Sequence, residues 1–413
     1  MELSKRLLSN DFLKKLMLLV SVGTPGIFRI AILFTLTQLY TMDMVGVVVY
    51  KWAIISTISL LTVDGLGALI SSRLPKAENK VMGVTVIAKQ FSNGLTLLCL
   101  LLLVWLIADP EFSYHDAIFA VSWLVYGMCR RILITTGEYL YLLMLEGVSM
   151  LVALSLLFVF KNEITNSNVS LIFTPLGFFS ICLLALLYGR TLFPSIKPSF
   201  ELIGIKFGFA NLLSGGVGLA LIPVIRTVYG DEWVGYLGLV LSILNVIFLA
   251  PRTMAQFHIP RMSQLTGLAM FDMYKTYRLQ LYVCLLFSLL AAPIIWYVEK
   301  NIYFHAGDDL AYFYIYMAVY VSMVVGQFSL APANYFMVSE QPKSLLMSNY
   351  IHVIILSIVS VLILVDMLPN SSTGVLALYL AALGSNFLRL IYMSYAVAVN
   401  ESGKAKEYNT ACN

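Results

Sequence analysis

Five charged residues lie inside stretches of sequence that are otherwise apolar. Arg29, Lys51 and Arg389 are cations, and Asp64 and Glu146 are acids. Placing one such charge in the hydrocarbon of a membrane costs at least about 2.5–3.5 kcal/mol, so each needs a partner, a wet cavity or a ligand. Guanidinium groups present forked donors that match phosphate oxygens, and lysine presents a compact positive charge. We therefore interpret Arg29, Lys51 and Arg389 as the lining of a cationic cavity that binds a phosphate-bearing anion.

The same charges have a second interpretation. Each cation could instead pair with a nearby acid or extend to a membrane surface. An acid held partly away from water can bind a proton or a cation, which would give Asp64 and Glu146 a role in ion coupling. A fixed ion pair with Arg29, Lys89 or Arg130 is the competing explanation for these two acids. The alternatives stay open until the packing of the helices is known.

The composition places these charges in a membrane protein. The chain has 413 residues, of which 60% are hydrophobic and 12% are charged, and its mean hydropathy is +0.87. So few charged residues could not cover the surface of a soluble protein of this size. The net charge of +4 is not by itself a sign of nucleic-acid binding, and we expect no nucleic-acid partner.

Twelve apolar stretches are long enough for membrane-spanning helices, which need roughly 20 residues to cross the hydrocarbon. We predict an all-α polytopic protein with spans at 16–40, 44–70, 82–107, 117–134, 139–160, 169–188, 207–228, 233–250, 279–298, 310–337, 345–368 and 374–399. Twelve spans put both termini on one side. If that side is cytoplasmic, the opposite loops contain only Lys161 and Lys300 as basic residues, in agreement with the positive-inside rule. The longest cytoplasmic loop is then 251–278, which contains Arg252.

The spans divide into two sets of six. Residues 191–206 contain prolines and basic residues, and we predict that they form a cytoplasmic linker between a lobe at 1–190 and a lobe at 207–413 that ends in a short cytoplasmic tail. A repeat supports the division, because the pattern Tyr-x4-Val-Gly begins at Tyr40 and again at Tyr229, between the first two spans of each lobe. Transporters built from such repeats bind their substrate between the lobes, near the middle of the membrane.

Motifs of common enzyme and cofactor sites are missing from the sequence. It contains no phosphate-binding P-loop, no G-x-S-x-G, no H-E-x-x-H and no D-x-D pair. The five cysteines are scattered without the spacing of metal ligands or of a disulfide framework. We therefore predict that the chain is not an enzyme and uses no cofactor and no metal.

Two short motifs resemble a known family of membrane proteins. The first consists of Val45-Gly46, then Val63-Asp64-Gly65-Leu66-Gly67 and Arg73. The second consists of Val234-Gly235, then Ile259-Pro260-Arg261-Met262-Ser263. They resemble the repeat patterns of the polysaccharide transport family, although the family's Asp-Leu-Gly-Leu reads Asp-Gly-Leu-Gly here. The chain looks most like O-antigen flippases of the Wzx type, in the multidrug, oligosaccharidyl-lipid and polysaccharide exporter superfamily.

The resemblance implies a substrate and a location. The substrate would be an oligosaccharide repeat unit of O-antigen on undecaprenyl pyrophosphate, moved by alternating access from the cytoplasmic to the periplasmic leaflet of the bacterial inner membrane during lipopolysaccharide biosynthesis. The implied partners are membrane lipids and the polymerase and chain-length regulator of the same pathway. Family members use cationic cavity residues, which by analogy supports Arg29, Lys51 and Arg389.

Two alternatives remain open. A multidrug or small-molecule exporter of the same superfamily would more naturally present acids to cationic drugs, so the charge of the cavity separates it from a flippase. An O-antigen polymerase or another membrane glycosyltransferase should carry catalytic residues on a large periplasmic loop. The longest candidate for such a loop, 299–309, is small.

Overall fold

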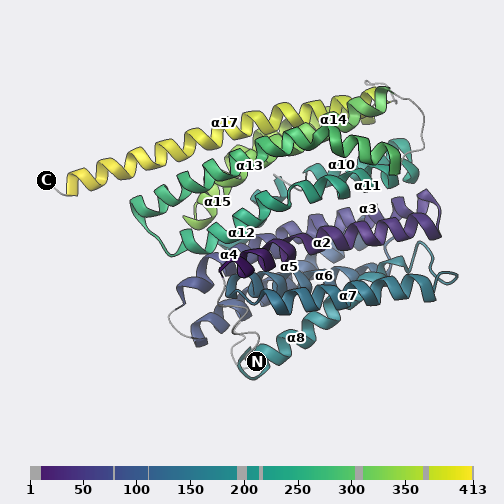
Figure 1. Cartoon of the computed structure of the whole chain (residues 1–413), viewed down its shortest axis with the longest axis horizontal. Helices are drawn as coiled ribbons and strands as arrows, with labels where there is room; N and C mark the ends of the chain where they lie inside the picture. The colour runs from purple at the N-terminus through teal and green to yellow at the C-terminus, as the bar shows by residue number, and fades with distance from the viewer. Residues whose placement is uncertain are drawn as a thin grey trace.

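The computed structural model describes residues 11–77, 80–109, 111–192, 202–213, 217–302, 310–365 and 372–411. Every element in these residues is helical, which confirms the all-α prediction (Figure 1). The first half of the chain contains α2 (Asp11–Leu39), α3 (Met42–Ser59), η1 (Leu60–Asp64), α4 (Gly65–Arg73), η2 (Leu74–Lys76), α5 (Lys80–Ala108), α6 (Tyr114–Thr136), α7 (Tyr139–Val159), η3 (Val169–Phe173) and α8 (Thr174–Leu192). The second half contains α9 (Leu202–Asn211), α10 (Val217–Tyr229), α11 (Asp231–Ile247), α12 (Leu249–Ser263), α13 (Gly267–Ile302), α14 (Leu310–Phe328), α15 (Leu330–Val338), α16 (Pro342–Leu364) and α17 (Ser372–Ala411).

The helices account for all twelve predicted spans. Nine helical segments in the described residues are long and apolar enough to cross a membrane, and each coincides with a predicted span. The described parts of the other three predicted spans are helical too: α9 and α10 cover 207–211 and 217–228, α11 covers most of 233–250, and α13 contains 279–298. Most of the long helices run in the same general direction (Figure 1). The chain is therefore a multi-pass membrane protein.

Several of the spans are interrupted. Span 44–70 comprises α3, the π-helix η1 and α4, and span 310–337 comprises α14 and α15 with Ser329 between them. A break at membrane depth leaves carbonyl groups that need other partners or a wet cavity. At Ser329, the hydroxyl donates to the carbonyl oxygen of Gly326 at 2.6 Å. π-Helical turns are frequent at functional sites, so η1 marks a region of interest.

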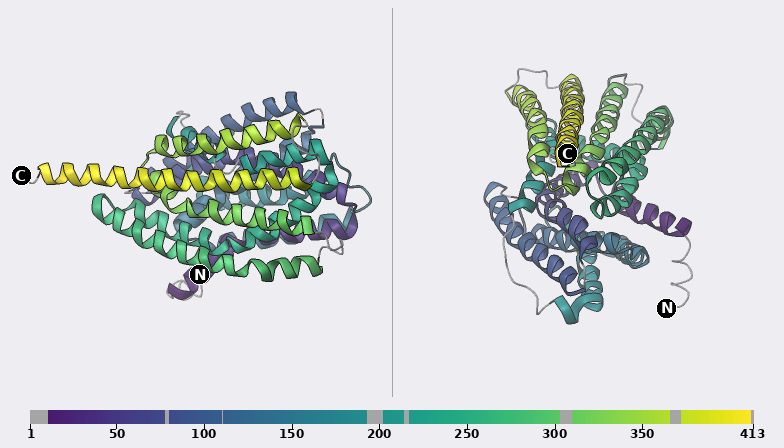
Figure 2. Two further views of the ribbon diagram at one scale, coloured as in Figure 1. Left: turned by 90° about the horizontal axis from the view of Figure 1, so that it is seen from above. Right: turned by 90° about the vertical axis from the view of Figure 1, so that its left-hand side faces the viewer.

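The helices form two groups, which we call the first lobe (α2 to α8) and the second lobe (α9 to α17). Viewed along the bundle in the right-hand panel of Figure 2, the last helices of the second lobe stand above the helices of the first. In the first lobe α2 packs against α7 and α6 against α8, and in the second lobe α17 packs against α14 and α16. Across the interface α3 packs against α11 and α4 against α9. The second span of the first lobe therefore forms much of the contact between the lobes.

The two copies of the Tyr-x4-Val-Gly repeat meet at this interface. A Cβ atom on Gly46 would overlap the backbone of Asp231, and a Cβ atom on Gly235 would lie 2.7 Å from the carbonyl oxygen of Met42. No side chain fits at either position unless a backbone moves. The two glycines therefore allow α3 and α11 to approach closely near their first turns.

The structure corrects the prediction of a loop at 251–278. These residues are mostly helical, because α12 continues to Ser263 and α13 begins at Gly267. The predicted span 233–250 ends just before Pro251, but Pro251 lies in the first turn of α12, where the backbone N–H has no helical acceptor. The helix therefore continues past Pro251 and takes Arg252 with it.

The predicted linker is shorter than expected within the described residues. α8 reaches Leu192 and α9 begins at Leu202, so both ends of 191–206 are helical. Residues 193–201 lie outside the described residues.

Candidate functional site

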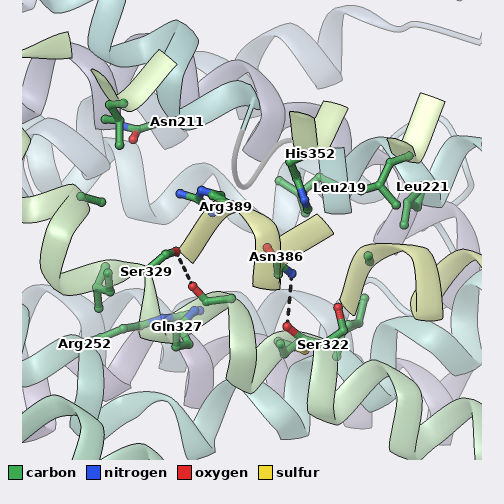
Figure 3. Close-up of a pocket in the computed structure, with 18 of the residues that line it drawn as sticks. Asn211, Leu219, Leu221, Arg252, Ser322, Gln327, Ser329, His352, Asn386 and Arg389 are labelled. Carbon is green, nitrogen blue, oxygen red and sulfur yellow. Dashed lines mark hydrogen bonds between the residues drawn. The ribbon is translucent and has the colours of Figure 1, made fainter. Parts of the chain in front are cut away.

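A cavity of about 450 Å³ lies among the helices (Figure 3). Three arginines line it, Arg29 from α2, Arg252 from α12 and Arg389 from α17. The lining residues that are polar without a fixed charge are Asn211, Ser322, Gln327, Ser329, Asn334, His352, Tyr379 and Asn386. Within the described part of the chain, no aspartate or glutamate is among the residues that line this cavity.

Arg29 reaches the cavity from the first lobe. Its guanidinium carbon lies 5.2 Å from the centroid of the Trp52 ring on α3, which is within the range of a cation–π contact. Its Nε is buried and has no hydrogen-bond partner. Among the described residues it forms no ion pair, so the aromatic face of Trp52 is its main electrostatic support. A buried guanidinium with an unused donor is well suited to an anionic ligand.

Arg389 reaches the same cavity from the second lobe. It is 7% exposed, and its Nε is also buried without a hydrogen-bond partner. Figure 3 shows Arg389, Asn386 and His352 together on one wall of the cavity. The amide of Asn386 donates to the carbonyl oxygen of Ser322 at 3.2 Å, which leaves its amide oxygen available as an acceptor. Arg389 therefore sits in a polar wall without an acid to neutralise it.

Arg252 is a cavity-lining cation that was not among the predicted site residues. The prediction placed it in a loop, whereas it lies near the start of α12 and lines the cavity. Arg252 and Arg29 line the same cavity, so their two positive charges share one polar space. The available signal was the position of Pro251, which is compatible with the first turn of a continuing helix.

Lys51 lies apart from this cavity. Its Nζ is 3.0 Å from Oδ1 of Asp116 and donates to the carbonyl oxygen of Asn166 at 2.8 Å. The two side chains of the ion pair are 6% and 1% exposed. Asp116 also accepts hydrogen bonds from the Ser113 backbone and hydroxyl. The structure therefore gives Lys51 a partner in the first lobe and does not bring it together with Arg29 and Arg389.

Asp64 lies on the π-helix η1 and pairs with a cation. Nη2 of Arg131 lies 2.5 Å from its Oδ1, and the carboxylate side chain is 33% exposed. This pairing is one of the alternatives that the sequence left open, although with Arg131 as the partner. Asp64 does not line the arginine cavity.

Glu146 lies deeper in the first lobe than Asp64. Its Oε1 accepts hydrogen bonds from the Tyr126 hydroxyl at 2.6 Å and from Nε of Arg130 at 3.2 Å. Its Oε2 is buried and has no hydrogen-bond partner. A small pocket beside it is also lined by Thr24 and Pro25 of α2. Glu146 therefore combines a fixed partner with one carboxylate oxygen that remains able to bind a proton or a cation.

Comparisons with known proteins identify the fold. No protein-family model matches the chain, and no curated protein sequence matches it. A structure described as "Crystal structure of MATE in complex with MaL6" superposes with a TM-score of 0.67 over 95% of both chains at 13% identity. An outward-facing "multidrug resistance MATE family transporter of the MOP superfamily" gives a TM-score of 0.65 over 95% of both chains at 12% identity.

A third structure, the MATE transporter ClbM in complex with Rb+, gives a TM-score of 0.61 over 92% of this chain and 93% of that chain, at 13% identity. Identities this low establish the likeness of the folds alone. The MOP superfamily named for the second structure is the superfamily that the sequence motifs resemble. The chain therefore has the fold of MATE transporters along nearly its whole length.

Proposed function

We propose that this protein is a flippase for an anionic, lipid-linked oligosaccharide, the O-antigen repeat unit on undecaprenyl pyrophosphate. The observation that supports the proposal is the charge of the cavity, whose lining, among the residues that the structure describes, contains three arginines and no aspartate or glutamate. A polar headgroup that carries two phosphates would neutralise these cations and use the buried donors of Arg29 and Arg389. A cationic substrate would meet repulsion in the same place.

The remaining polar lining residues suit the sugar part of this substrate. Amides and hydroxyls can donate to and accept from sugar hydroxyls, and Asn211, Gln327 and Asn386 are amides on the cavity wall. The polyprenyl tail would remain in the bilayer beside the protein. The substrate would enter at the cytoplasmic leaflet of the bacterial inner membrane and leave at the periplasmic leaflet, with both chain termini cytoplasmic.

The energy for transport would come from an ion gradient through Glu146 or Asp64. Glu146 has the stronger support, because one of its carboxylate oxygens is buried without a hydrogen-bond partner. Asp64 is paired with Arg131 and partly exposed, so its role would require that pair to separate. The solved structure of ClbM holds Rb+, which supports a search for cation binding in this chain as well.

A second candidate function is the export of drugs or other small molecules. It is supported by the solved structures with this fold, one of which is described as a multidrug resistance transporter. The cavity charge argues against cationic drugs, so the exported compounds would be anionic or neutral. Lys51 stays a proposed substrate contact only in a conformation in which its pair with Asp116 has separated.

The two functions can be tested in one set of strains. A strain that lacks the gene and no longer displays the glycan receives the wild-type chain, Arg29→Ala or Arg389→Ala, with protein levels matched by immunoblotting. Under the flippase proposal, wild type restores surface glycan and each variant reduces it at least tenfold. Wild-type display by both variants would falsify the proposal. Export of an anionic dye by wild type, without any effect on glycan display, would favour the second candidate.

A further inference from the structure

The cavity belongs almost entirely to the second lobe. Arg29 is the single residue before position 207 among those that line it in the described part of the chain. All the others come from the second half, from Phe207 in α9 to Arg389 in α17. The break between α14 and α15 at Ser329 adjoins the cavity. A ligand in this space would therefore contact one lobe along most of its surface.

The interior of the first lobe is filled instead. Trp52, Phe119, Trp123 and Phe173 form a cluster with ring centroids 4.3 Å apart for Phe119 and Phe173, and 5.2 Å apart for Trp52 and Trp123. The pairs Lys51–Asp116 and Arg130–Glu146 occupy other parts of the same lobe. The described pocket in this lobe, beside Glu146, has a volume of only about 10 Å³, which is no more than the space of one water molecule. Aromatic rings and ion pairs therefore occupy this part of the first lobe, whereas the arginine cavity opens among helices of the second.

Arg29 connects the two lobes through charge. It is held on the first lobe by the ring of Trp52, and it lines the same cavity as Arg252 of the second lobe. When the cavity is empty, closing the lobes brings like charges together without a neutralising acid. A pyrophosphate between these groups would reverse the sign of the interaction and attract Arg29 toward the second lobe. The loaded protein would therefore close more readily than the empty protein.

We infer that the second lobe binds the anionic headgroup by itself, mainly through Arg389. We further infer that Arg29 makes closure of the two lobes depend on whether the headgroup is bound. The inference rests on the proposed function. It assigns different tasks to two residues that the sequence presents as equivalent cations: Arg389 sets the affinity, and Arg29 couples binding to closure of the lobes. A ligand can shift such an equilibrium only by the difference in its affinity for the two states, and Arg29 supplies that difference.

The test measures binding and closure separately in the purified full-length protein. The probe is farnesyl pyrophosphate, with farnesyl monophosphate for comparison. Spin labels on Thr136→Cys and Thr266→Cys, in a background without the native cysteines, report the distance between the lobes. Thr136 ends α6 of the first lobe, Thr266 lies between α12 and α13 of the second lobe, and both are exposed. Equilibrium binding of the same probe is measured on the same preparations.

The expected results differ between the two arginines. In the parent protein, farnesyl pyrophosphate should raise at least twofold the fraction of molecules whose spin labels are close together. Farnesyl monophosphate should raise this fraction by a smaller factor. Arg389→Ala should weaken binding at least tenfold. Arg29→Ala should change the dissociation constant by less than threefold and abolish the distance response, whereas Arg29→Lys should retain part of it. Arg29→Gln replaces the alanine variant if that variant does not purify as a folded protein.

Two results would overturn the inference while the proposed function stands. One is an unchanged distance response in Arg29→Ala, and the other is a loss of binding in Arg29→Ala as large as that in Arg389→Ala. If the parent protein binds neither prenyl phosphate, the proposed function fails and the inference fails with it.

Discussion

Arg73 at the end of α4 and Glu340 between α15 and α16 form a two-point ion pair between the lobes. Nε of Arg73 lies 3.2 Å from Oε1 of Glu340, and Nη2 lies 3.3 Å from Oε2. A second pair between the lobes joins Arg226 of α10 to Glu111, with Nη2 and Oε2 2.8 Å apart. Arg73 ends the second span of the first lobe, whereas Glu111 lies just before α6, so the two pairs hold the lobes together at different places.

Reversing the charges of the first pair should test its role in closure. We expect Glu340→Arg to lower transport several-fold and to favour separated lobes, because it places two arginines side by side. The double variant Arg73→Glu with Glu340→Arg should recover most of the lost transport. Both side chains are about a third exposed, so the pair should contribute only about 1 kcal/mol or less. Spin-label distances between Thr136 and Thr266 measure the effect, and a double variant no better than the single one would contradict it.

Arg252 should matter as much as Arg29 and Arg389, the two predicted cations that line the cavity. Arg252→Ala removes one of the three positive charges of the cavity, and we expect glycan display to fall at least tenfold. Arg261→Ala is the matched control, because Arg261 lies on the same helix but outside the cavity, with its guanidinium 3.7 Å from the ring of Phe257. Display by Arg261→Ala should stay within twofold of wild type. Equal losses in the two variants would point to damage to α12 and away from a role in binding.

Lys51 should act on stability and not on substrate binding. Lys51→Ala leaves the buried carboxylate of Asp116 without its cation, and breaking a buried pair costs about 3–5 kcal/mol. We expect a lower midpoint of thermal unfolding in detergent and less protein in the membrane. Lys51→Met combined with Asp116→Asn removes both charges and should recover most of the stability. Glycan display per molecule of the double variant should equal that of wild type. A tenfold lower display by the double variant would instead support Lys51 as a substrate contact.

Gly46 should be sensitive to even the smallest side chain. Gly46→Ala would force α3 and α11 apart where their backbones meet, and overpacking of this kind costs about 1–3 kcal/mol. Gly147→Ala on α7 is the control, because an added Cβ there meets no atom within 4 Å. The midpoint of thermal unfolding should fall for Gly46→Ala and stay the same or rise slightly for Gly147→Ala. Equal midpoints for the two variants would show that the lobes can accommodate a larger spacing.

Glu146 should couple transport to an ion gradient. Glu146→Gln keeps the hydrogen bond with Tyr126 available but removes the charge, so we expect transport in proteoliposomes to become independent of an imposed gradient. Asp64→Asn is the comparison, because the same charge is removed at a carboxylate that Arg131 already neutralises. A gradient dependence that survives in Glu146→Gln and disappears in Asp64→Asn would transfer the coupling role to Asp64.

The sequence was sufficient for the helices but not for their partners. A span is recognisable because about 20 consecutive apolar residues satisfy a local requirement of the membrane. Arg29 and Arg389 were identifiable for a similar reason, since a charge inside such a span needs an explanation. The partner of Lys51 was not identifiable, because Asp116 lies 65 residues away and meets it only through the packing of α3 against α6. Arg252 was missed because it lies just past the predicted span 233–250, and the cavity that it lines is built from helices distant in the sequence.

The difference between the lobes also lay outside the reach of sequence analysis. Both halves have six predicted spans, and a copy of the Tyr-x4-Val-Gly pattern lies between the first two spans of each. Whether an apolar helix fills a lobe or lines a cavity depends on which face it turns inward and on how aromatic rings such as those of Trp52 and Phe173 interlock. These are properties of the packed structure and leave no local pattern.

The unequal filling of the lobes has a consequence for how this protein can evolve. Substitutions at many positions in α14 to α17 could change the shape of the cavity or the hydrogen bonds to the substrate. The aromatic interior of the first lobe would stay intact. In the described part of the first lobe, Arg29 is the one position at which a change would reach the substrate directly. Adaptation to a new glycan is therefore expected to accumulate in the second half of the sequence, while the first half changes under the separate demands of folding and energy coupling.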